Sequence, residues 1–257
     1  MYVNQITFTR TRPCKPDDEA VTDTIQWLLG VWRNNGQVCG REWPMLGHAD
    51  VVTATVLTPE AQSLDAGFHS QYAREALARC EAEGWLVACD VLGKDVDAMA
   101  TCSCKTPSAW LLFTTYESIG TPVRCMDCFK PSALYRFEAM ASGDFYELMS
   151  WQTEYQCFDT LQMTCTVLEK EATRELSKLG SSLTKKGLAH CKTLAASSQK
   201  PFYYYLYRGH GRSHQAEMKR RCPGCGDAWA LETPIHSIFD FKCDRCCLVS
   251  NIAFDVK

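Results

Sequence analysis

The sequence predicts a mixed α+β protein, and three observations carry this prediction. Strand-like and helix-like segments alternate through residues 1–95. Apolar residues then recur every three or four positions between 148 and 183, which is typical of helices packed on a core. Short-spaced cysteine pairs form two clusters, at 102–128 and 222–246. We therefore expect four parts in order: an α/β sandwich (1–95), a first four-cysteine segment (96–140), a helical segment (141–199), and a basic, aromatic strand followed by a second four-cysteine segment (200–257).

The first part has the element order strand, helix, strand, helix, strand. Alternating apolar residues predict strands at 2–9, 48–58 and 85–93, and QVCGREW (37–43) is a further candidate strand. Helical spacing predicts helices at 17–35, ended by Asn35-Gly36, and at 68–84, ended by Gly84. With the extra strand, this order is that of a β-α-β-β-α-β sandwich of the ferredoxin-like type.

The middle of the chain combines the first cysteine cluster with a long helical region. The cluster surrounds an apolar strand at 109–116. The helical stripe that follows includes Leu148, Trp151, Tyr155, Phe158, Leu161, Cys165 and Leu168, and it continues to Leu183 past a break at Gly180. We expect a pair of helices that face the core.

The last part begins with a strand at 202–208 and a polar, basic loop or short helix at 209–221. Three short strands are expected at 228–232, 237–242 and 248–254.

Composition favours a folded protein of the reducing cytosol. Hydrophobic residues make up 46% of the chain, and no apolar run is long enough for a membrane span or a signal peptide. Cytosolic cysteines more often bind metal or remain free thiols than form disulfides, and this chain has 16 of them.

The second cluster has the spacing of a zinc ribbon. Cys222 and Cys225 form one Cys-x-x-Cys pair, and Cys243 and Cys246 form the other. Glycine at 224 and 226 suits a tight turn, and strands between the pairs can bring four thiolates onto one tetrahedral zinc ion. Two disulfides or metal-free thiols are the alternatives. Cys247 stands where a second glycine would ease the turn; it is either a bystander thiol or a ligand in place of Cys246.

The first cluster predicts a second structural zinc ion. It joins Cys102 and Cys104, separated by one residue, to the ordinary pair Cys125 and Cys128. Partly buried thiols, or a weak site, are the alternative, and an iron–sulfur cluster is a further option for either group. With four protein ligands each, neither zinc ion would keep an open position for a substrate, so both are expected to be structural.

The chain resembles a bacterial family of uncharacterised Zn-ribbon-containing proteins to which nucleic-acid binding has been attributed. The resemblance covers nearly the whole chain and implies a cytosolic protein with zinc at the second cluster. The similar stretches are WRNNGQVCGREWP (32–44), CSCKTPSAWLLFTTY (102–116), RCMDCF (124–129), PSALYRF (131–137), DFYELMSWQTEYQCFDTLQM (144–163), FYYYLYR (202–208) and most of 221–254.

The segment before the ribbon suggests single-stranded nucleic acid as a partner. Three tyrosines of the strand would share one face and could stack on bases, while the following cations could contact phosphate. The candidate residues are Tyr203, Tyr205, Tyr207, Arg208, Arg212, Lys219, Arg220 and Arg221. Alternatively, the tyrosines pack against the helices and the charges are simply solvated. The net charge of −3 also disfavours a general polyanion binder.

A protein-interaction module is the other hypothesis, as an adaptor, a subunit of a complex, or an immunity protein that neutralises a basic toxin. The acidic start of the first helix, Asp17, Asp18, Glu19 and Asp23, could face such a partner, although the same residues also suit a helix N-terminus. We do not expect an enzyme, because the sequence has no phosphate-binding glycine loop and its six histidines show no catalytic spacing.

Overall fold

A computed structural model describes residues 1–11 and 19–256, which divide into two compact units. The first unit comprises Met1–Ser103 with Ile119–Thr121 and Lys130–Tyr146, and the second comprises Cys104–Ser118, Pro122–Phe129 and Glu147–Lys257. Each unit contains one sheet and its own helices, so the α+β prediction is confirmed.

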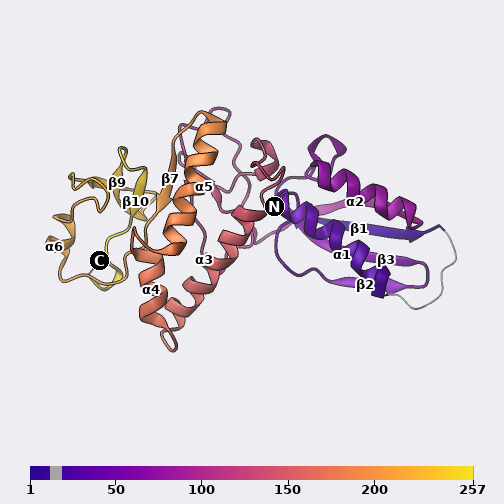
Figure 1. The fold of residues 1–257 in the computed structure, drawn as a ribbon, viewed down its shortest axis with the longest axis horizontal. Helices are drawn as coiled ribbons and strands as arrows, with labels where there is room; N and C mark the ends of the chain where they lie inside the picture. The colour runs from indigo at the N-terminus through magenta and orange to yellow at the C-terminus, as the bar shows by residue number, and fades with distance from the viewer. Residues whose placement is uncertain (12–18, 257) are drawn as a thin grey trace. The chain divides into compact units, whose positions relative to one another are not determined.

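The first unit has the elements β1 (Tyr2–Arg10), α1 (Glu19–Asn34), β2 (Met45–His48), β3 (Val51–Thr58), α2 (Gln71–Ala82) and β4 (Trp85–Lys94). Its strands form an antiparallel sheet in the order β2-β3-β1-β4, with α1 and α2 beside it (Figure 1). The predicted helix 68–84 and strands 2–9 and 85–93 are therefore present. The start of the predicted helix 17–35, with Asp17 and Asp18, lies outside the described residues.

Two details of the first unit differ from the prediction. The strand expected at 48–58 is present as β3, which begins only at Val51, because Ala49 adopts a φ of 50° and turns the chain from an additional strand, β2, into β3. The candidate strand at 37–43 does not form, and only Cys39 makes an isolated bridge, to Leu57.

The core of this unit is formed by side chains from one face of a strand and from one face of each helix. Ile6 and Phe8 of β1 are fully buried, as are Leu28 and Leu29 of α1, and α2 adds Cys80. Two 3-10 turns complete the unit, at Ala66–Phe68 and Leu134–Arg136.

The second unit has a mixed six-stranded sheet in the order β6-β5-β7-β10-β9-β8. Its strands are β5 (Trp110–Leu112), β6 (Val123–Cys125), β7 (Phe202–Tyr205), β8 (Ala230–Ile235), β9 (Phe239–Cys243) and β10 (Leu248–Ser250). β7 lies between β5 and β10 and is parallel to both. One continuous sheet thus joins the segments of the two cysteine clusters, and the strands expected after residue 200 are present with shifted or shortened bounds.

Helices α3 (Tyr146–Thr164), α4 (Glu169–Ser177) and α5 (Ser182–Ser198) belong to this unit, and α5 runs beside β7 (Figure 1). The side chain of Ser181 caps the N-terminus of α5, so the helical region is interrupted at Gly180, where the sequence predicts a break. The predicted stripe is buried at Leu148, Trp151 and Tyr155, but Leu168 is exposed because α3 ends at Thr164.

Short elements complete the chain: α6 (His214–Met218) and a 3-10 turn at Phe254–Val256. Among the described residues, no helix has the length and apolar character needed to cross a bilayer.

Candidate metal centres

The second cluster gathers four thiols at the end of the sheet. The sulfur atoms of Cys222, Cys225, Cys243 and Cys246 all lie within 4.8 Å of one another, and those of Cys225 and Cys243 are 3.6 Å apart. Cys243 ends β9, and the backbone N–H of Cys222 donates to the Asp227 carbonyl at 2.9 Å, which closes the first turn. The predicted ligand set is therefore assembled in one place.

Glycine at position 224 is required by the close approach of the two turns. A Cβ atom there would lie 2.7 Å from the Sγ atom of Cys246, well inside contact distance. The turn carrying Cys222 and Cys225 can thus reach the facing sulfur only without a side chain at this position.

The pKa values of the thiols in this cluster are shifted in different directions. Burial opposes ionisation of Cys222, but hydrogen bonds from the backbone N–H groups of Cys225 and Gly224 outweigh it and lower the pKa of that thiol. Burial and the neighbouring thiols raise the pKa of Cys246 well above its usual value. Four adjacent thiolates are therefore unfavourable without a cation to compensate their charge.

The residue after each Cys-x-x-Cys pair adopts the left-handed conformation. Its φ is 77° at Gly226, 50° at Cys247 and 60° at Phe129. Cys247 thus occupies the position that glycine fills in the facing turn. It is not a member of the four-cysteine group, and its Sγ atom donates to the Asp244 carbonyl at 3.5 Å. Between the two alternatives for Cys247, the geometry favours a bystander thiol.

The first cluster also comes together. The sulfur atoms of Cys102, Cys104, Cys125 and Cys128 lie within 4.8 Å of one another. Cys125 ends β6, and the Phe129 N–H donates to its carbonyl at 2.9 Å, as Gly226 does to Cys222 in the second cluster. The Cys-x-Cys pair therefore reaches the same arrangement as an ordinary Cys-x-x-Cys pair.

Asp127 ties the first cluster's turn to the chain before β5. Its carboxylate accepts hydrogen bonds from the hydroxyl of Ser108 and, at 2.8 Å, from the Ser108 N–H. These bonds lower the pKa of Asp127, which is otherwise exposed. The turn is thereby held against the segment that follows Cys104.

The hairpin formed by β8 and β9 contacts the turn between Cys125 and Cys128, and the sequence does not predict this contact. His236, in the β8–β9 turn, has Nε2 2.7 Å from the Met126 carbonyl oxygen. Its ring stacks on Phe129 with centroids 5.1 Å apart and planes inclined by 25°. The only sequence signal is an aromatic residue directly after a cysteine pair, which on its own is uninformative.

The donor sets fit a thiophilic metal ion. In tetrahedral zinc sites the Zn–S distance is about 2.3 Å, which separates the sulfurs by about 3.8 Å. The 3.6 Å between the sulfurs of Cys225 and Cys243 is close to this spacing. All-sulfur sets favour zinc or iron–sulfur clusters over hard cations. Both groups can therefore hold metal ions.

The tyrosines predicted to stack on bases are buried, and this corrects the stacking hypothesis. Tyr203, Tyr205 and Tyr207 are 5%, 6% and 8% exposed. β7 is an inner strand, and the Tyr205 ring packs on Phe113 and Phe239. Two of the hydroxyls also donate hydrogen bonds within the protein: that of Tyr203 donates to Asp244 at 2.6 Å, and that of Tyr205 donates to Asn251 at 2.9 Å. No ring face of these three is available to a base.

The cations of this segment fall into two groups. Arg208 forms a 2.6 Å ion pair with the buried Glu217. Arg220 lies 3.5 Å from the same carboxylate, its guanidinium carbon is 4.2 Å from the Phe241 ring centre, and burial lowers its pKa to about 10. Their predicted phosphate contacts are therefore replaced by structural roles. Arg212, Lys219 and Arg221 are exposed and make no ion pair with the described residues.

Family models match the chain in three consecutive pieces, each described only as a domain of unknown function. DUF8589 matches residues 1–88, DUF2310 matches 104–207 and DUF8594 matches 211–256. The last match coincides with the second cluster and its hairpins.

Two relatives from Haemophilus influenzae, each titled "Uncharacterized protein", are similar to the chain. One is 32% identical over 260 residues, covering 99% of both chains. The other is 35% identical over 165 residues, covering 64% of this chain and 81% of the relative. The first alignment includes both units and both cysteine clusters.

Proposed function

The chain belongs to the family of these Haemophilus influenzae relatives, and we propose that it is a zinc-stabilised protein-interaction module. In this proposal each four-cysteine group holds one structural zinc ion in the cytosol, where thiols stay reduced. The observation that carries it is the exposed, apolar edge of the first unit's sheet, formed by β4.

β4 is a long strand with one unpaired edge. It spans Trp85–Lys94, stands last in the order β2-β3-β1-β4, and pairs only with β1 among the described strands. Leu86, Val91 and Leu92 are 63%, 49% and 59% exposed. Proteins usually protect such an edge with charges, proline or a covering segment, because it offers a template for another strand.

A groove accompanies this edge. Residues of α2 and the start of β4 line a volume of about 490 Å³, with Leu77, Trp85 and Leu86 on its walls and Arg74 and Glu81 among its polar residues. An extended partner segment that adds a strand to β4 would place alternate apolar side chains in this groove. The partner we propose is therefore a protein with an exposed, extended apolar segment.

Substitution of Leu86 tests this proposal, and β2 supplies the matched control. Leu86→Lys puts a charge on the edge of β4, whereas Leu46→Lys does so on the opposite edge strand, where Leu46 is 74% exposed. In quantitative affinity purification, the wild type and Leu46→Lys should retain one and the same protein. Leu86→Lys should weaken its binding at least about tenfold, since a buried apolar contact of 1.5–3 kcal/mol is lost.

A photo-crosslinker placed at position 86 should join the chain to that same protein. Equal retention by the two lysine variants would contradict the proposed surface.

Nucleic-acid binding is the second candidate, and one observation favours it: Arg212, Lys219 and Arg221 are exposed cations without an acidic partner among the described residues. With the tyrosines buried, only phosphate contacts are proposed. Three contacts predict a slope of log K against log salt of about −2 for single strands.

Fluorescence anisotropy with single-stranded DNA and RNA at two salt concentrations measures this slope. Replacing Arg212, Lys219 and Arg221 together by glutamine should abolish binding. The same change at Lys178, Lys185 and Lys192, three exposed lysines of the helical region, should not. Binding that survives the first triple change would place the contact elsewhere.

The element order and the antiparallel strand order β2-β3-β1-β4 support a ferredoxin-like assignment for the first unit. No catalytic role is proposed, because four cysteine ligands at each centre leave no position for substrate or water.

A further inference from the structure

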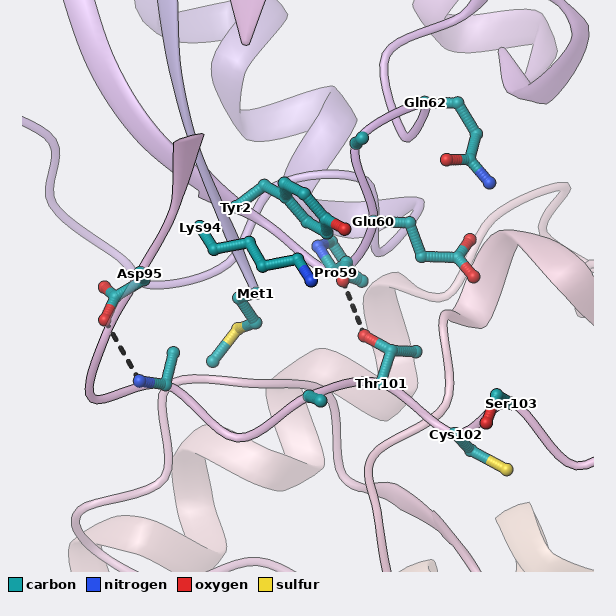
Figure 2. A pocket seen from close by; sticks show the side chains of 13 residues that line it. Met1, Tyr2, Pro59, Glu60, Gln62, Lys94, Asp95, Thr101, Cys102 and Ser103 are labelled. Carbon is teal, nitrogen blue, oxygen red and sulfur yellow. Dashed lines mark hydrogen bonds between the residues drawn. The ribbon is translucent and has the colours of Figure 1, made fainter. Parts of the chain in front are cut away.

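We propose that the first unit binds a small carboxylate ligand in a pocket at the end of its sheet. The pocket has a volume of about 330 Å³, at the lower end of the range for small-molecule sites. It is lined by the start of β1, the end of β4, the loop after β3 and residues 98–103 (Figure 2). This site lies at the opposite end of β4 from Leu86, and it does not depend on the protein partner proposed for that edge.

Lys94 supplies a cation that the protein itself leaves unpaired. It ends β4, and its ammonium group lies 5.9 Å from the ring centre of Tyr2, with no ion pair to any described acid. Figure 2 shows the two side chains lying together across the pocket. A lysine held beside an aromatic ring can keep its three N–H donors available for a ligand.

The two acids of the pocket are already engaged, so they do not serve as the partner of Lys94. Oε2 of Glu60 accepts hydrogen bonds from Tyr135 at 2.6 Å and from Arg136 at 2.7 and 2.9 Å. Oδ1 of Asp95 accepts from the backbone N–H groups of Asp97 and Ala98 at 2.8 and 3.0 Å. In Figure 2 the Asp95 carboxylate turns back toward its own loop.

The remaining polar groups favour an acceptor over a donor. The Tyr2 hydroxyl makes no hydrogen bond to the described residues, and it lines the pocket beside Lys94. Because a carboxylate only accepts hydrogen bonds, it can accept from an ammonium and a phenol at once. The charge and the donors therefore match a ligand carboxylate.

Part of the remaining wall is apolar, and the segment that carries it is held in place. Met1, Pro59, Ala61, Ala98 and Ala100 contribute small or flexible apolar surfaces, which suit a short hydrocarbon part of the ligand. The Thr101 hydroxyl donates to the Pro59 carbonyl at 2.6 Å, and the Cys102 N–H donates to the Pro131 carbonyl at 2.8 Å. These bonds fix the segment that closes the pocket, so the ligand meets a preformed wall.

Isothermal titration calorimetry of the zinc-loaded full chain tests the proposal with butyrate as the probe. Butylamine, of the same size and opposite charge, and inorganic phosphate, an anion without a hydrocarbon part, are the contrasting probes. We expect saturable binding of butyrate and none of butylamine. Lys94→Gln should weaken butyrate binding about tenfold or more, and Tyr2→Phe about fivefold, because charged and neutral hydrogen bonds differ in strength.

Lys185→Gln, an exposed lysine change on α5, is the matched control and should bind butyrate like the wild type. Thermal unfolding of Lys94→Gln and Tyr2→Phe should match that of the wild type, and Tyr2→Phe keeps the ring if the lysine variant folds poorly. Absence of saturable butyrate binding would overturn the proposal. So would equal affinity in the Lys94→Gln variant, or binding of phosphate in place of butyrate.

Discussion

The two cysteine clusters reach the same four-sulfur geometry from different sequences. The second is built from two Cys-x-x-Cys turns, and the first replaces one of them with Cys102 and Cys104, only one residue apart. In the second cluster a left-handed glycine, Gly226, follows one pair, whereas in the first a left-handed Phe129 follows the ordinary pair. The comparison shows that the turn requires a left-handed backbone conformation, and that at Phe129 the packing of the side chain compensates the strain.

The largest expected effect is loss of one metal ion with each disabled cluster. Elemental analysis of the purified chain should give two zinc ions per wild-type chain and one for either Cys125→Ser or Cys243→Ser. Structural zinc sites contribute about 10–16 kcal/mol of apparent binding free energy, so both variants should also unfold at lower temperature.

Cys247→Ser is the control for this experiment, because Cys247 lies outside the four-sulfur group. It should retain two zinc ions. Loss of a metal ion in this variant would make Cys247 a ligand, and iron in place of zinc would overturn the zinc assignment at both centres.

An intermediate effect is expected at Phe129, where packing and strain oppose each other. The ring contacts Phe113, Phe239 and His236 with centroids 5.1–5.6 Å apart. Phe129→Gly would remove contacts worth about 3–4 kcal/mol and relieve about 1–2 kcal/mol of left-handed strain. We expect a net destabilisation of about 1–3 kcal/mol in denaturant unfolding of the zinc-loaded chain.

His236→Ala separates the stacking contact from the rest of this effect. It should account for only part of the loss, since the other two rings remain. A Phe129→Gly variant as stable as the wild type would contradict the view that packing compensates the strain.

Cysteine spacing is sufficient to predict which thiols gather, but sequence patterns do not predict which residues form the surface around them. Cysteine spacing identifies ligands because two short turns constrain where the sulfurs can lie, and both groups assemble as expected. The tyrosine strand failed as a predicted surface because alternation shows which residues share a face but not whether that face is covered. β7 became an inner strand through its pairing with β5, which lies about 90 residues earlier in the chain.

Local turns were also beyond the sequence patterns. The turn between β2 and β3 depends on Ala49, which has no intrinsic preference for a φ of 50°. Likewise, the two arginines at 208 and 220 were taken as exposed because they lie in a basic segment. Both arginines instead pair with a single buried acid, Glu217.

The smallest expected effect is at Cys247, the counterpart of Phe129 in the second cluster. Its side chain makes no aromatic packing contact, so its φ of 50° is strain that little compensates. Cys247→Gly should stabilise the zinc-loaded chain by about 0.5–1 kcal/mol in denaturant unfolding, because about 1–2 kcal/mol of strain is relieved while glycine makes the unfolded chain more flexible. Cys247→Ser keeps the strain and should be close to neutral. If the glycine variant is no more stable than the serine variant, the left-handed turn is unstrained, and the opposite signs predicted for Phe129 and Cys247 lose their common cause.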